Sequence, residues 1–239
     1  MLDDTDLTRV LVVGAHPDDV DFGAAGTVAR WTDAGVEVAY LILTDGDSGG
    51  FDPDVPRSEI PGIRQAEQRA AAKCVGVDNV RFLSYPDGRL ESTLALRRDI
   101  TREIRVVRPQ RMVIHSPERN WEAVYAFHPD HLEAGEAALR AVYPDARNPF
   151  AYPELLRDEG LEAWTVPEVW LMGGPRSDHH VEVTETFDRK TAALLAHTSQ
   201  TGHMDGLEDM LRGWHAARAR AVGLADGQLA ETFQVVATV

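Results

Sequence analysis

The sequence predicts an α/β protein with a mostly parallel sheet and helices on both faces of that sheet. Short apolar runs of β-branched character alternate along the chain with longer stretches whose apolar residues recur at helical spacing. Such alternation is typical of βαβ units. Hydrophobic residues make up 44% of the 239 residues, which is enough for a substantial buried core. Because no linker or repeat interrupts the pattern, we expect a single domain over residues 1–239.

The expected elements follow from local signals. The strands are expected over residues 10–13, 36–44, 80–84, 112–115, 169–172 and 181–183, and the first of them is a continuous apolar run, as expected of a strand buried on both faces. The helices cover residues 21–34, 59–75, 94–107, 132–142, 187–197 and 207–222. Gly35 and Pro109 mark the ends of the first and third of these helices. Glycines and prolines predict a loop over residues 45–61.

Composition excludes several classes of protein. The chain has 39 acidic and 24 basic side chains and a formal charge of −15, so nucleic-acid phosphates and anionic membrane surfaces would be repelled. Cys74 is the only cysteine, which excludes an intramolecular disulfide and a thiolate zinc cluster. No apolar run approaches the ~20 residues that span a bilayer, and the N-terminus is acidic where a secretory signal is basic. We expect a cytoplasmic protein, and the sequence leaves a homo-oligomer open.

Two loops rich in histidine and aspartate follow the first and fourth predicted strands. The first reads Gly14-Ala15-His16-Pro17-Asp18-Asp19, and the second ends in His128-Pro129-Asp130-His131. The carboxyl ends of parallel strands meet at one edge of a sheet, and α/β proteins bind their ligands there. We therefore expect the two loops to converge on a functional site.

These loops contain the residue types that bind a catalytic metal. His16 and Asp19 are three residues apart, so the first turn of a helix would place both side chains on one face. His131 would complete a set of two imidazoles and one carboxylate, which with water in the fourth position suits one catalytic zinc ion per chain. The same set also suits Fe(II). Asp18 is left beside the metal as a general base, and His128 is left opposite it to stabilise an oxyanion or deliver a proton.

The paired motifs resemble those of the PIG-L/LmbE family of zinc-dependent N-acetylglucosaminyl deacetylases. Other segments are also similar to family segments: Arg64 and Glu67, Pro86-Asp87-Gly88, Lys190, and His197-Thr198-Ser199-Gln200. The resemblance covers most of the chain and implies a Rossmann-like fold, with zinc bound by His16, Asp19 and His131.

The resemblance also implies roles for further residues. These are Asp18 as the base, His128 as an electrostatic partner, Asp130 as the residue that orients His128, and Arg64 and Asp87 as contacts to sugar hydroxyls. As a neighbouring carboxylate, Asp130 is expected to keep the His128 imidazole protonated near neutral pH. The family often has a tyrosine two residues before the second motif, where this chain has Ala126 beside Tyr125.

The sequence therefore predicts a metal-dependent amidase that removes an N-acyl group from a small-molecule amino sugar or glucosaminyl conjugate. The acyl group expected first is acetyl. One alternative is an Fe(II) oxygenase with the same ligands, which is disfavoured because the chain lacks a β-barrel pattern. Another is a non-catalytic module that binds a metal or a sugar, which would need neither Asp18 nor His128. His115 is interpreted as structural. For His197, a buried structural role explains the sequence as well as a functional one.

Overall fold

The structure is a computed structural model that describes residues 1–121, 124 and 127–239. The strands are β1 (Arg9–Gly14), β2 (Glu37–Thr44), β3 (Asn79–Tyr85), β4 (Arg111–His115), β5 (Glu168–Met172), β6 (His179–Glu182) and β7 (Ala230–Ala237). The helices are α1 (Asp19–Asp33), α2 (Ile60–Cys74), α3 (Leu94–Val107), α4 (Pro129–Arg140), α5 (Pro153–Glu159), α6 (Phe187–Ala196), α7 (Thr198–Thr201) and α8 (Leu207–Ala221). A π-helical turn, η3 (Ala141–Ala146), extends α4.

The described residues form a seven-stranded sheet in the order β3-β2-β1-β4-β5-β7-β6. The first five strands pair in parallel, whereas β7 runs antiparallel to both β5 and β6. The chain moves outward from β1 to β3 and then returns to place β4 on the other side of β1. In open α/β sheets such a reversal creates the crevice in which ligands bind. The predicted Rossmann-like, mostly parallel sheet is confirmed.

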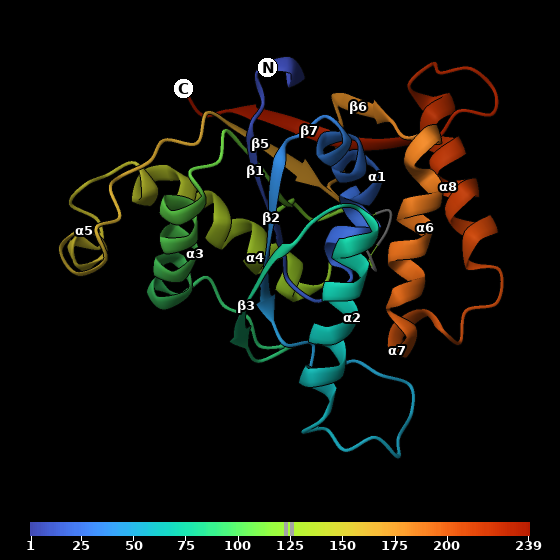
Figure 1. Cartoon of the computed structure of the whole chain (residues 1–239), viewed down its shortest axis with the longest axis horizontal. Coiled ribbons are helices and arrows are strands. Elements are labelled where there is room, and N and C mark those ends of the chain that lie inside the picture. The colour runs from blue at the N-terminus through green and yellow to red at the C-terminus, as the bar shows by residue number, and fades with distance from the viewer. Residues whose placement is uncertain (122–123, 125–126) are drawn as a thin grey trace.

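Helices cover both faces of the sheet, with α1, α2, α6 and α8 on one side and α3 and α4 on the other (Figure 1). Alternate residues of β1 enter the two cores. Val10 and Val12 pack in the core beneath α1, whereas Leu11 and Val13 pack in the core beneath α3 and α4. All four side chains are buried. Burial on both faces is the reason that the central strands appear in the sequence as unbroken apolar runs.

Some elements differ from the expected ones. Helices α1 and α4 begin at Asp19 and Pro129, earlier than predicted, so that both motifs lie at helix N-termini. Helix α5 and strand β7 were not predicted. Strand β7 contains polar residues such as Glu231, so its sequence is typical of an exposed segment. Glu231 is nevertheless fully buried.

A buried ion pair joins β7 to the helices that support the first loop. Lys190 of α6 places its Nζ 2.7 Å from Glu231 Oε1, and both side chains are fully buried. The same ammonium donates to the main-chain oxygens of Asp21 and Phe22, each at 2.8 Å. Glu231 Oε2 accepts hydrogen bonds from the amide and the hydroxyl of Thr27. The pair therefore holds α1, which begins in the first His/Asp loop, against the C-terminal part of the chain.

The longest helices in the described ranges, α1, α2 and α8, have 15 residues each. Within those ranges no helix has both the length and the apolar character needed to cross a membrane.

Candidate active site and metal centre

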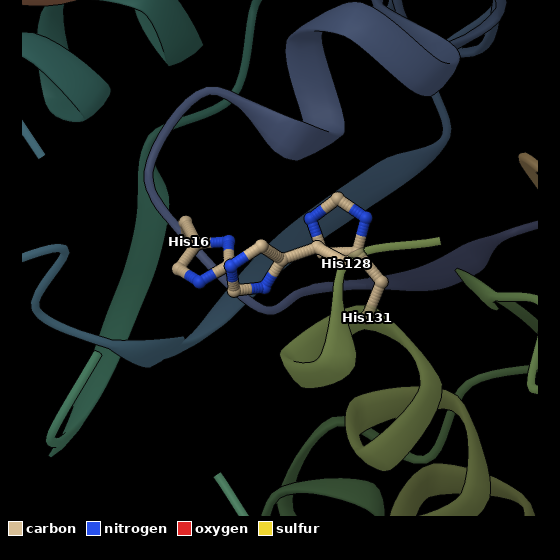
Figure 2. Close-up of side chains that lie close together, drawn as sticks. All are labelled: His16, His128 and His131. Carbon is tan, nitrogen blue, oxygen red and sulfur yellow. The ribbon is translucent and has the colours of Figure 1, made fainter. Parts of the chain in front are cut away.

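The two His/Asp loops meet at the edge of the sheet, beyond the carboxyl ends of β1 and β4. His16 lies in the turn between β1 and α1, whereas His128 is the N-cap of α4 and His131 lies in its first turn. Figure 2 shows their three imidazoles close together. The ring centroid of His16 is 5.0 Å from that of His128 and 5.3 Å from that of His131. The expectation that His16 lies in the helix itself is wrong, because α1 begins only at Asp19.

The carboxylate of Asp19 lies at the centre of the cluster. Its Oδ1 is 3.0 Å from His131 Nε2, and its Oδ2 is 3.3 Å from His16 Nδ1. The main-chain amide of His16 donates to the same Oδ2 at 2.7 Å, which closes the turn before α1. Burial disfavours the charge of Asp19, but His131 and His115 outweigh it and hold the pKa of this carboxyl well below its usual range. The carboxylate is thus kept ionised, as a metal ligand must be.

The donor atoms fit a metal ion. One set of groups within 4.8 Å of one another comprises His16, His128 and His131, and a second comprises Asp19, His115 and His131. Imidazole nitrogens combined with a carboxylate oxygen suit zinc or another divalent transition metal. Each of the three ligands expected from the sequence belongs to at least one of these sets, and their assignment as the ligands stays a prediction.

Three carboxylates surround His16. Its Nε2 is 3.1 Å from Asp87 Oδ1 and 3.1 Å from Asp130 Oδ2, and its Nδ1 faces Asp19. Burial lowers the pKa of His16, but the hydrogen bonds to Asp130, Asp19 and Asp87 outweigh it and raise the pKa to about 12. The site therefore demands positive charge among its carboxylates. A divalent cation would supply that charge, and His16 would have to release its proton in order to bind one.

His115 belongs to this cluster, although the sequence analysis interprets it as structural. It ends β4, its Nε2 is 3.1 Å from Asp19 Oδ2, and its ring stacks on His131 with centroids 4.1 Å apart. Burial, helped by His131, lowers the pKa of His115 to about 4, so the ring is neutral at pH 7. Its place as the last residue of the fourth strand is the signal that could have identified it, because side chains at that edge face the ligand site.

Asp18 has a strained backbone. Its φ is 93°, a left-handed conformation that is uncommon for residues other than glycine. It is the N-cap residue of α1, yet its side chain makes no capping hydrogen bond, and its Oδ2 lies 3.0 Å from Arg64 Nη2. Burial raises the pKa of Asp18 to about 6, although Arg64 opposes the shift. Strain that turns a carboxylate away from its capping role is a mark of functional sites.

Arg64 is buried beneath the glycine-rich loop that precedes α2. Its Nη2 donates to the main-chain oxygen of Pro17 at 2.6 Å, and its Nη1 donates to that of Gly46 at 3.1 Å. A Cβ atom at Gly46 or Gly49 would come within 2.4 Å of Nη1, so glycine at these positions makes room for the guanidinium. A contact between Arg64 and sugar hydroxyls stays a prediction.

The carboxylate of Asp130 contacts groups other than His128. It accepts hydrogen bonds from the amides of Gly88 at 2.7 Å and Leu90 at 3.2 Å, besides its contact with His16. The main-chain amide of Asp130, in contrast, donates to His128 Nδ1 at 3.2 Å. Burial is the largest influence on His128 and lowers its pKa, His16 lowers it further, and Asp130 only partly opposes them. The expectation that Asp130 keeps this imidazole protonated is therefore not met.

The tyrosine position before the second motif cannot be compared with the structure. Tyr125 and Ala126 lie outside the described residues.

Comparisons with known proteins find a matching family and related chains. The family model described as PIG-L, GlcNAc-PI de-N-acetylase, matches residues 11–142. The chain is 31% identical over 195 residues to a diacetylchitobiose deacetylase of Thermococcus kodakarensis, which covers 82% of this chain and 71% of that protein. It is 34% identical over 215 residues to a probable N-acetyl-alpha-D-glucosaminyl L-malate deacetylase 2 of Bacillus cereus, covering 87% of this chain and 88% of that protein.

A solved structure is similar over nearly the whole chain. The N,N'-diacetylchitobiose deacetylase of Pyrococcus horikoshii superimposes with a TM-score of 0.88 at 28% identity, covering 97% of this chain and 85% of that one. The segment matched by the family model begins in β1 and ends in η3, so it contains both His/Asp loops. The chain therefore belongs to the PIG-L (GlcNAc-PI de-N-acetylase) family, as its two motifs predict.

Proposed function

We propose that the protein is a zinc-dependent deacetylase that hydrolyses the N-acetyl group of a small-molecule amino sugar or glucosaminyl conjugate. The observation that carries the proposal is a largely buried carboxylate with a pKa of about 6, Asp18, beside a cluster of histidine and aspartate donors. The names of the two relatives support the substrate class, because diacetylchitobiose and N-acetylglucosaminyl malate both contain an N-acetylated amino sugar.

His16, Asp19 and His131 would hold the zinc ion, which when bound acidifies water and polarises an amide carbonyl. Asp18 accepts the proton of the attacking water as the new C–O bond forms at the amide carbon. The C–N bond then breaks, and the amine departs with the proton that Asp18 accepted. A base with a pKa close to the working pH combines a high ionised fraction with adequate basicity, which the burial of Asp18 provides.

His128 supplies a neutral donor in this scheme. Its Nδ1 accepts a hydrogen bond from the Asp130 amide, so the proton of the neutral ring resides on Nε2. An Nε2–H group aimed at the amide oxygen acts mainly when that oxygen becomes anionic, which is in the transition state. The lowered pKa of His128 favours this neutral form.

Replacing His128 should therefore impair chemistry more than substrate binding. We expect His128→Ala to lower kcat by about 10²- to 10³-fold with little change in KM, which is the usual cost of one oxyanion donor. His128→Asn is the matched variant, because asparagine is a good N-cap and keeps the start of α4 intact. Both kcat and KM are measured beside metal content. A large rise in KM at unchanged kcat would assign His128 to substrate binding alone.

The proposed function is tested with a series of N-acetylated amino sugars, by detecting released amine. We expect the protein to bind about one metal ion per chain and to deacetylate at least one sugar, to lose activity with a chelator, and to regain it with zinc. Fully loaded protein that releases no amine from any of them would contradict the proposal. Oxygen consumption by the Fe(II)-loaded protein would favour the oxygenase alternative.

A further inference from the structure

Two side chains of α2 bind both ends of one peptide unit beside Asp18. The oxygen of that unit belongs to Pro17 and accepts a hydrogen bond from Arg64 Nη2 at 2.6 Å. Its N–H belongs to Asp18 and donates to Gln68 Oε1 at 2.8 Å. Gln68 is fully buried, and Arg64 is 4% exposed. Because the two residues are four positions apart on a helix, both reach the loop from the same face of α2.

The orientation of this peptide unit sets the backbone conformation of Asp18. The φ angle of Asp18 is the rotation about the bond from the Asp18 amide nitrogen to the Asp18 Cα. On the other side of Cα, the Asp18 oxygen accepts hydrogen bonds from the amides of Asp21 at 2.9 Å and Phe22 at 3.0 Å, which fixes it to α1. With one peptide held by α1 and the other by α2, φ is held at 93°. A non-glycine residue keeps such a value only when its surroundings impose it.

Gln68 is itself fixed in one orientation. Its Nε2 donates to Asp21 Oδ2 at 2.7 Å, and His197 Nε2 lies 2.9 Å from the same oxygen. Because the main-chain N–H of Asp18 can only donate, the oxygen of the Gln68 amide must face Asp18 and its NH₂ group must face Asp21. Asp21 and His197 are fully buried, as is Gln68. This assigns the buried His197 to the support of the first loop.

We propose that Gln68 is a positioning residue for the hydrolysis, and that with Arg64 it clamps the peptide before Asp18 so that the Asp18 carboxylate stays off the first turn of α1 and remains available to the reacting water. Without the clamp, Asp18 would relax to ordinary N-cap geometry, in which an aspartate accepts hydrogen bonds from amides of the first helical turn. The carboxylate would then be engaged with α1 and turned away from the reacting water. The inference rests on the proposed role of Asp18 as the base.

Gln68→Met tests the clamp, because methionine has nearly the same length and volume but makes neither hydrogen bond. We expect kcat for an N-acetylated amino sugar to fall about 10- to 100-fold, the usual effect of displacing a catalytic group by about 1 Å. KM and metal content should stay within about twofold of the wild type. Thr101→Val is the matched control, since Thr101 lies on α3 across the sheet, is fully buried, and has no hydrogen-bond partner for its hydroxyl among the described residues.

Two further measurements separate positioning from a merely structural role. In an Asp18→Asn background, Gln68→Met should lower the residual rate no further, because two residues that act through one group are not additive. A further fall equal to that in the wild-type background would overturn the proposal. If Gln68→Met does not fold, Gln68→Asn replaces it, since asparagine keeps the amide but withdraws it by one methylene.

Hydrogen exchange at the Asp18 amide tests the clamp without any substrate. We expect faster exchange in Gln68→Met than in the wild type, and no change in Thr101→Val. Equally slow exchange in Gln68→Met would overturn the clamp, and faster exchange with unchanged kcat would overturn its role in catalysis. Wild-type protein that deacetylates no sugar would instead contradict the proposed function, so the two failures are distinct.

Discussion

Asp18→Asn should lower kcat by about 10²- to 10⁴-fold while the metal stays bound, which is the usual contribution of a general base. Asparagine has the size of aspartate and tolerates a left-handed φ, so the 93° backbone conformation is preserved. Alanine at this position would combine the loss of the carboxylate with backbone strain. The Asn variant therefore isolates the ability of Asp18 to accept a proton.

The measurement is kcat together with metal content for Asp18→Asn, with Asp19→Asn as the neighbouring control. Because Asp19 contacts both His16 and His131, its replacement should reduce metal binding itself. Loss of metal from Asp18→Asn and its retention in Asp19→Asn would reverse the roles given to the two aspartates. Unchanged kcat in Asp18→Asn would assign the proton to another group.

Lys190→Met should destabilise the protein by about 3–5 kcal/mol, the usual cost of removing one partner from a buried ion pair. Neither side chain of the pair is exposed to solvent. Burial raises the pKa of Glu231, but Lys190 outweighs it and keeps the pKa below its usual value, so the carboxylate depends on that ammonium. In the variant, Glu231 must either stay charged without a counter-ion or bind a proton, and both cost free energy.

Urea unfolding of Lys190→Met, followed by circular dichroism, measures this effect as a change in the free energy of unfolding. The double variant Lys190→Met with Glu231→Gln should recover part of the loss, because no charge is then left unpaired. A single variant within about 1 kcal/mol of the wild type would show that solvent reaches Glu231.

The sequence by itself determined the fold class and the edge of the sheet at which the two His/Asp loops meet. Continuous apolar runs identify strands covered on both faces, because a parallel sheet leaves neither face to water. Loops that follow such strands must emerge at one edge of the sheet, which is why His16 and His131 could be placed together although 115 residues separate them. The residues of the two motifs then carried the resemblance to the family.

Only the tertiary structure decided which side chains support the site. His115 reaches Asp19 and Gln68 reaches Asp18 across elements that are distant in the chain, and no local pattern records such contacts. The contact of the Asp130 carboxylate with His16 depends on the loop after β3, whose amides also bind that carboxylate. The sequence pattern does not identify strand β7, because a glutamate such as Glu231 indicates an exposed position. Glu231 can be buried only because Lys190 pairs with it. Local periodicity reports burial, whereas pairing between buried polar groups is decided by the packing of distant segments.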